Sequence, residues 1–130
     1  VIAILVNPKK QPAFTLDQRV EMLSLDFGEE PRVRIVTFEG TAAELLKREE
    51  TEFYVRGIRN STDLDFENAN FYASKKLDEN LTAVYLPCRQ ELLHVSSSMV
   101  RNSLHFGTPI DEYVSEKVKE YIKGSVATLG

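Results

Sequence analysis

The sequence predicts an α/β fold in which helices cover both faces of a doubly wound parallel sheet. Short apolar runs alternate with segments of helical periodicity along the whole chain, which is the pattern of such a sheet. The 130 residues, 42% of them hydrophobic, suffice for one domain with a substantial core. No apolar run approaches the ~18 residues of a membrane span. We therefore expect a single domain over residues 1–130.

Four apolar runs predict the strands of the sheet. The run at the start of the chain is apolar throughout, as expected for a strand that is buried on both faces. The expected strands are residues 1–6, 33–38, 53–55 and 83–86. The chain opens on the first of these strands without a methionine, so we expect further residues upstream of Val1 in the intact protein.

Helix signals lie between and after these runs. Thr15 with Gln18, and Thr41 with Glu44, each have the spacing of a capping box, and Gly28 is expected to end the first helix. The later helices are expected over residues 62–77, over residues 95–107, and as an amphipathic segment with apolar positions 114, 118, 121 and 122 that ends at Gly124.

Charge and cysteine content narrow the possible functions. The formal net charge is -4, which argues against nucleic acid or an acidic membrane as a partner. Any affinity for phosphate then has to come from a local cluster of basic groups. The single cysteine excludes an internal disulfide and fits a reducing compartment, so we expect a cytoplasmic protein.

Three strand-to-helix loops carry unusual residues: 7–14, 56–63 and 88–98. In a parallel sheet with right-handed crossovers such loops lie at one rim, which is where ligands bind. We therefore expect the three loops to form one site although they are far apart in the sequence.

The second loop has Arg56 and Arg59 on either side of Gly57. Guanidinium groups are permanently charged and pair with phosphate oxygens, so this arrangement favours an anionic, phosphorylated ligand. The alternative is two solvated arginines around a turn glycine. Glu67, in the following helix, could accept a hydrogen bond from a sugar hydroxyl, position an arginine, or be one of several solvated acids.

The other two loops add basic and hydroxyl groups. Lys9 and Lys10 lie between two prolines, and a lysine there could follow a phosphoryl group during a reaction, or simply be solvated. The serines at positions 96–98 precede a helix and have no Glu or Gln three residues later. We expect this helix start to lack a capping box and to bind phosphate, with ordinary N-capping as the alternative.

Other types of site are disfavoured. His94 and His105 lack the spacing of metal ligands, so we expect no metal-binding residue. The sequence also contains no nucleophile elbow, Walker loop or dinucleotide-binding glycine motif.

Taken together, these segments resemble the phosphopantetheine adenylyltransferase family of nucleotidyltransferases. The resemblance runs from Val1 to about Ile122. It rests on residues 7–10 with Pro12 and Phe14, residues 15–20, residues 55–59 with Asp63 and Glu67, and residues 95–101. It implies a Rossmann-like nucleotidyltransferase fold. It also implies adenylyl transfer from ATP to 4′-phosphopantetheine, assisted by Mg²⁺, which yields dephospho-coenzyme A and pyrophosphate in coenzyme A biosynthesis.

The resemblance implies roles for individual residues. Lys10 and Arg59 correspond to catalytic residues, and Lys10, Ala42 and Arg56 to residues that bind the acceptor. The implied ATP-binding residues are Gly57, Ile58, Arg59, Glu67, Leu92, Leu93, His94, Val95, Ser96, Ser97 and Ser98. The resemblance further implies a homohexamer and coenzyme A as an inhibitor.

Two departures from the family pattern leave alternatives open. The family's first strand, and the helix start that supplies a threonine and a histidine, are expected upstream of Val1 and are not among these residues. In the helix after Glu67, the positions of a family glutamine and an asparagine-arginine pair hold Ala69, Ser74 and Lys75. The alternatives are a nucleotidyltransferase acting on another phosphorylated acceptor, such as nicotinate mononucleotide, and a catalytically inert nucleotide-binding fragment.

Overall fold

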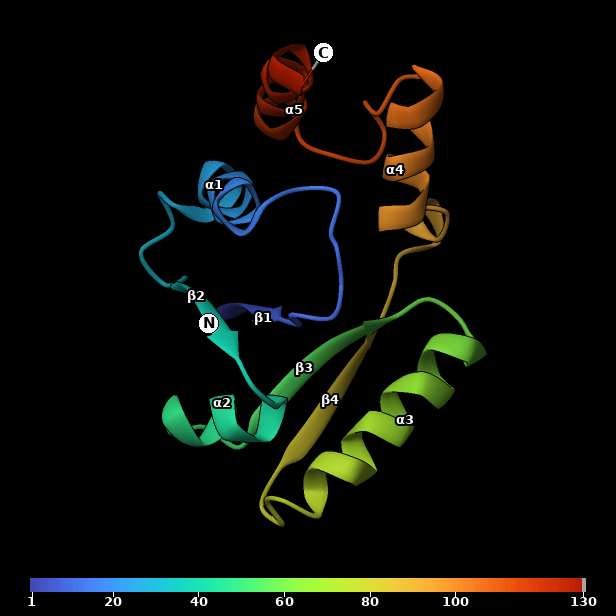
Figure 1. Ribbon diagram of the computed structural model, residues 1–130. Helices are drawn as coiled ribbons and strands as arrows, with labels where there is room; N and C mark the ends of the chain where they lie inside the picture. Colours follow the sequence, from blue (N-terminus) through green and yellow to red (C-terminus); the bar gives the residue numbers. More distant parts are fainter. Residues whose placement is uncertain (130) are drawn as a thin grey trace. The chain divides into compact units, whose positions relative to one another are not determined.

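The computed structural model describes residues 1–129, and the side chains of residues 1–125. Strands and helices alternate along the chain, as the sequence predicts (Figure 1). In chain order the elements are β1 (Ile2–Val6), α1 (Leu16–Phe27), β2 (Ile35–Glu39), α2 (Ala42–Arg48), β3 (Phe53–Ile58), α3 (Ser61–Lys75), β4 (Thr82–Pro87), the 3₁₀ helix η1 (Gln90–Leu92), α4 (Ser97–Phe106) and α5 (Glu116–Leu129). Among the described residues, none of these helices combines the length and the apolar character that crossing a membrane requires.

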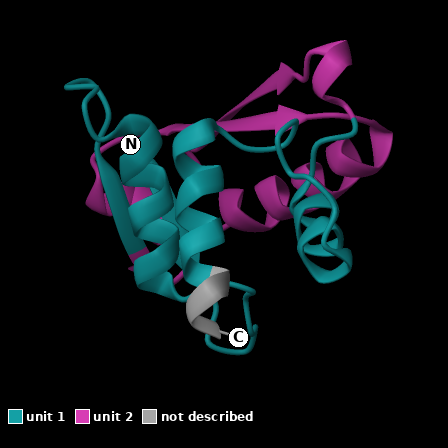
Figure 2. Cartoon of the chain, turned by 90° about the horizontal axis from the view of Figure 1, so that it is seen from above, with its two compact units in different colours: residues 1–37, 94–130 teal, residues 38–93 magenta. Residues whose placement is uncertain are grey.

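The chain forms two compact units (Figure 2). The first consists of Val1–Thr37 with His94–Gly130, and the second of Phe38–Leu93. Strands β1 and β2 pair in one sheet and β3 and β4 in another, and β2 passes from the first unit into the second. The expectation of one domain over residues 1–130 stays a prediction.

The second unit is built on the parallel pair β3 and β4. The register runs from Phe53 opposite Thr82 to Ile58 opposite Pro87, and α3 makes the connection between the two strands (Figure 1). Helix α3 packs against β3, and α2 packs against α3. The core of this unit is made by Ala43, Leu46 and Leu81, with Tyr54 and Phe71 packed against them. Alternating elements with parallel pairing confirm the predicted α/β class.

The first unit has a core of its own, around the C-terminal helix. Ile110, Val118 and Ile122 form its buried centre. Helix α1 packs against α5, as Figure 2 shows, and contributes Met22 and Leu25 to this cluster. Val114, Val118 and Ile122, three of the four apolar positions that predict the last helix, therefore lie in this core.

Both predicted capping boxes are present. The backbone N–H of Gln18 donates to Thr15 Oγ1 over 3.2 Å, and the backbone N–H of Thr15 donates to Gln18 Oε1 over 2.8 Å. Thr41 and Glu44 exchange the same two bonds over 2.7 and 3.2 Å at the start of α2. Each box satisfies backbone donors that a helix start otherwise leaves unpaired.

The predicted end of the last helix is wrong. Helix α5 continues through Gly124 to Leu129. Gly107 ends α4 in the left-handed conformation that favours glycine, with φ 68°, whereas Gly28 ends α1, as predicted, with a right-handed φ of -63°. Gly124 has no positive φ and remains helical, at the modest cost of a glycine inside a helix.

Candidate anion-binding site

The arginine pair of the second unit lies at the junction of β3 and α3. The sequence predicts that the strand ends at Val55, and this boundary is wrong because β3 continues to Ile58. Arg56 is therefore a strand residue, opposite Tyr85 of β4, while Arg59 follows the last strand residue. Tertiary pairing decides this boundary, because Gly57 is paired in register with Leu86 and adopts no positive φ that would make a turn.

Arg56 is held by a buried carboxylate. Its Nε and Nη2 both donate to Oε1 of Glu67, over 3.0 and 2.7 Å. The Glu67 side chain is only 7% exposed, whereas that of Arg56 is 45% exposed. Mainly through the hydrogen bonds with Glu67, the pKa of Arg56 is raised above its ordinary value. Of the three roles open to Glu67 in the sequence, the solvated acid is wrong, and the contact that the structure shows positions an arginine.

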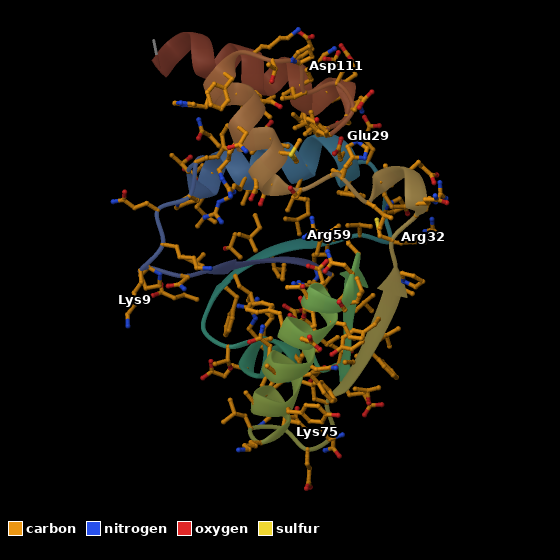
Figure 3. All side chains as sticks on the ribbon, turned by 90° about the vertical axis from the view of Figure 1, so that its right-hand side faces the viewer. Lys9, Glu29, Arg32, Arg59, Lys75 and Asp111 are labelled. Atoms are coloured by element: carbon orange, nitrogen blue, oxygen red, sulfur yellow. The ribbon has the colours of Figure 1, made fainter. Side chains whose placement is uncertain are left out.

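Arg59 is held by a second carboxylate, four residues further along the chain (Figure 3 labels Arg59). Asp63 Oδ2 accepts from both the backbone N–H and Nε of Arg59, over 3.1 and 2.9 Å, and Oδ1 accepts from Nη2 over 3.2 Å. The side-chain hydrogen bond with Arg59 is the main cause that lowers the pKa of Asp63 below its ordinary value. The same bond raises the pKa of Arg59. Neither arginine is therefore a purely solvated side chain.

Gly57 leaves open space beside the strand. An ideal Cβ built on it would meet no heavy atom within 4 Å. Since side chains alternate along a strand, Gly57 shares a face of the sheet with Phe53 and Val55, which are exposed. The packing of the described residues does not require glycine here, so close approach of a ligand to the backbone is a physical reason for it.

In the first unit, the loop after β1 presents exposed lysines. The Asn7 side chain accepts a hydrogen bond from the backbone N–H of Lys9 over 3.0 Å, and the Asn7 carbonyl accepts one from the N–H of Lys10 over 3.1 Å. These bonds form a turn that holds the backbone while both lysines remain exposed. The Lys9 side chain points away from the loop (Figure 3).

The helix start at the serines lacks a reciprocal capping box, as expected, but it has the ordinary N-cap that the sequence analysis gave as the alternative. Ser96 is the N-cap of α4, and its Oγ accepts from the backbone N–H of Met99 over 3.2 Å. Ser97 and Ser98 form the first turn, and Ser98 Oγ accepts from Arg101 Nη2 over 3.1 Å. A lone serine caps a helix without a Glu or Gln three residues later, because that residue supplies only the return bond. The first-turn N–H groups of a helix still lack intrahelical partners, which is the physical basis of anion binding there.

The remaining predicted residues lie on both units. Ala42 is the first residue of α2, and Ile58 ends β3, where its carbonyl accepts from the N–H of Cys88 over 2.9 Å. Leu92 and Leu93 are exposed at the end of η1. In the first unit, His94 packs edge-on against the Tyr113 ring, and Val95 is partly buried.

The structure thus brings Arg56, Arg59 and Glu67 together within the second unit. Lys10 and the serines belong to the first unit. The expected site at one rim would combine loops from both units, so this expectation stays a prediction.

Sequence reasoning gave no role to three residues that contact or neighbour the arginine pair. Asp63 bonds Arg59, and its spacing of four residues from both Arg59 and Glu67 was the available signal. Tyr54 lies two residues before Arg56, whose guanidinium carbon is 5.5 Å from the centre of the Tyr54 ring. The Tyr85 hydroxyl is buried beside this cluster and has no hydrogen-bond partner within the part of the chain that the structure describes. No signal in the sequence identifies Tyr85.

Comparison with known proteins identifies relatives of this chain. A family model described as cytidylyltransferase-like matches residues 1–103. The chain is 34% identical over 119 residues to a phosphopantetheine adenylyltransferase of Flavobacterium johnsoniae, and the match covers 92% of this chain and 78% of that protein. Proteins of the same name from Lachnoclostridium phytofermentans and Symbiobacterium thermophilum are 31% and 32% identical. Those two matches cover 94% and 88% of this chain, and 75% and 70% of the relatives.

Proposed function

Because this chain belongs to the phosphopantetheine adenylyltransferase family, we propose that it transfers the adenylyl group of ATP to 4′-phosphopantetheine. A phosphate oxygen of the acceptor attacks the α-phosphorus of ATP, the bond from that phosphorus to the β-phosphate oxygen breaks, and pyrophosphate leaves. The product is dephospho-coenzyme A, an intermediate of coenzyme A biosynthesis. The nucleophile belongs to the substrate, so the protein contributes positioning and charge.

The observation that carries this proposal is the arginine pair of the second unit. Arg56 and Arg59 each donate to a carboxylate of α3, so their guanidinium groups are oriented before any ligand arrives. Preorganised cations stabilise negative charge on phosphoryl oxygens without reorganising during the reaction. In the proposed site Arg56 binds the acceptor and Arg59 binds the ATP phosphates.

We assign the remaining contacts by the same correspondence. Lys10 binds the acceptor phosphate and stabilises the charge that develops in the transition state, and Ala42 contacts the pantetheine arm. ATP contacts the end of β3 at Gly57 and Ile58, the segment from Leu92 to Val95, and the helix start at the serines. Exposed first-turn serines and an exposed lysine have the chemistry that these roles require.

Magnesium is proposed to accompany ATP. Within residues 1–129 no group of three or more His, Cys, Asp or Glu side chains is placed to hold a metal ion, so we assign no protein ligand to it. Magnesium commonly binds through substrate phosphates, and bridging them would neutralise part of their charge. We also propose a cytoplasmic homohexamer that coenzyme A inhibits, as the family resemblance implies.

Pyrophosphate release tests the acceptor. Purified protein with ATP and magnesium is offered 4′-phosphopantetheine or nicotinate mononucleotide, and release is measured with and without a chelator. We expect release with 4′-phosphopantetheine only. Release with the mononucleotide alone would assign the alternative acceptor. ATP binding without release would identify an inert nucleotide-binding fragment.

Gly57→Ala is expected to lower ATP affinity without loss of stability. Because a Cβ meets no protein atom, the free energy of unfolding should stay unchanged or rise by about 0.4–1 kcal/mol. A methyl group that enters space taken by the nucleotide should lower affinity about tenfold, as overpacking by about 1–3 kcal/mol does. Calorimetric titration with ATP measures the affinity, and Gly124→Ala, also in open space, is the control. Equal affinities in wild type and Gly57→Ala would remove the proposed contact.

A further inference from the structure

Helix α3 places two carboxylates on one face. Asp63 and Glu67 are four residues apart, which aligns them one turn above the other, and each bonds an arginine at the β3–α3 junction. Phe71, four residues further along the same stripe, packs on the core of the second unit. The stripe is therefore the inner face of the helix, where apolar side chains are the usual occupants.

The burial of Glu67 requires an explanation. It is the buried residue of α3, at 6% exposure, in a helix whose other residues are partly or fully exposed. Removing a carboxylate from water is costly unless the charge is paired and hydrogen-bonded. A leucine at this position would bury apolar surface without that cost, so the core of the unit gains nothing from the acid. The contribution of the acid is the two hydrogen bonds that it accepts from Arg56.

The geometry of this pair constrains the guanidinium group. Nε and Nη2 lie on one edge of the Arg56 fork, and both donate to Oε1 of Glu67. The Tyr54 ring lies 5.5 Å from the guanidinium carbon and restricts it further. With one edge bound, the guanidinium group is restricted in its rotation, while the side chain, still 45% exposed, remains accessible to a ligand.

Asp63 constrains Arg59 through backbone and side chain together. Its two oxygens accept three hydrogen bonds from Arg59, one of them from the backbone N–H. Asp63 is itself held because its backbone N–H donates to the Asn60 side chain, the N-cap of α3, over 2.9 Å. The guanidinium group of Arg59 is thus tied to the first turn of the helix.

We infer that Asp63 and Glu67 are positioning residues: Glu67 orients Arg56 toward the acceptor, and Asp63 orients Arg59 toward ATP. This inference rests on the proposed function for the identity of the two ligands. It differs from the role that family resemblance implies for Glu67, which is direct contact with ATP. It also differs from simple neutralisation, in which each acid only weakens the attraction of its arginine for anions.

The test compares Glu67→Gln and Asp63→Asn with Asp65→Asn. Asp65 is an exposed acid of the same helix between the two, so its replacement makes the same change in charge. Dissociation constants for 4′-phosphopantetheine and for ATP are measured by calorimetric titration. We expect Glu67→Gln to weaken acceptor binding and Asp63→Asn to weaken ATP binding, each about tenfold or more, as the loss of a charged hydrogen bond does.

A spectroscopic measurement detects orientation without any substrate. In ¹H–¹⁵N spectra, the Nε–H signals of Arg56 and Arg59 are slowed in exchange with water while they donate to the carboxylates. Glu67→Gln should shift and broaden the Arg56 signal alone, and Asp63→Asn the Arg59 signal alone. Asp65→Asn should change neither.

Several outcomes would overturn the inference. Weaker ATP binding with normal acceptor binding in Glu67→Gln would mean direct contact with ATP. Tighter binding of either ligand would mean neutralisation, and equal weakening of both ligands with a lowered melting temperature would mean a structural role only. If Glu67→Gln does not fold, the Asp63→Asn measurements decide.

Failure of the proposed function is recognisable separately. A wild-type protein that binds neither ligand contradicts the function, and the Nε–H signals then decide whether the carboxylates orient the arginines. Unchanged signals in both variants would overturn the inference in that case too.

Discussion

Replacing Arg59 by alanine is expected to lower the rate of adenylyl transfer by about 10²–10³-fold. The arginine supplies a permanent positive charge at the start of α3, held in place by three hydrogen bonds with Asp63. Water that fills the space cannot replace a charge whose orientation is already fixed. The measurement is steady-state pyrophosphate release over a range of ATP concentrations, which separates kcat from KM. The Lys10→Ala substitution is expected to lower the rate by a similar factor.

Arg32→Ala is the matched control for this experiment. Arg32 is also paired with a nearby carboxylate, Glu30, over 2.8 Å, but its side chain is 86% exposed. Its removal should leave the rate unchanged, because exposed pairs of this kind contribute little. A near-normal rate in both Arg59→Ala and Lys10→Ala would refute the proposed roles.

Replacing Leu81 by alanine is expected to destabilise the second unit by about 2–5 kcal/mol. Leu81 is 1% exposed and packs with Ala43 and Leu46 between α2 and the start of β4. Removal of its branched end leaves a cavity that its neighbours fill only in part. Since the free energy of unfolding of small proteins is about 5–15 kcal/mol, this single change removes a large fraction of it. Urea denaturation followed by circular dichroism measures the loss.

Leu77→Ala controls for the chemical change itself. Leu77 lies four residues before Leu81 and is 57% exposed, so its truncation creates little cavity. We expect a change within about 0.5 kcal/mol. Equal losses at the two positions would contradict the assignment of Leu81 to the core.

Local signals predicted much of the fold. The capping boxes at Thr15 and Thr41 involve residues three apart, so backbone geometry alone brings them together, and both are present. The alternation of elements and the α/β class are also confirmed. The predicted ends of β3 and α5 were less accurate. Strand β3 continues past Gly57 because it pairs with β4, and helix α5 continues through Gly124.

The sequence predicted the chemical type of ligand for the candidate site, but not which residues of the site contact one another. The residue types at positions 56–59 pointed to an anionic ligand because guanidinium groups bind phosphate whatever their surroundings. Which carboxylate holds which arginine depends on how α3 lies against β3, and that packing has no local signal. For the same reason Asp63 and Tyr85 were given no role.

The sequence by itself therefore determined the class of fold, the starts of α1 and α2, and the charge character of the site. These depend on neighbours within one turn or one strand, or on the chemistry of the residue type. Only the tertiary structure decided that β3 extends to Ile58, that Glu67 is buried, and that the two acids of α3 each hold an arginine. The physical reason is that burial and pairing between a strand and a helix arise from their packing, which the spacing of residues along the chain does not specify.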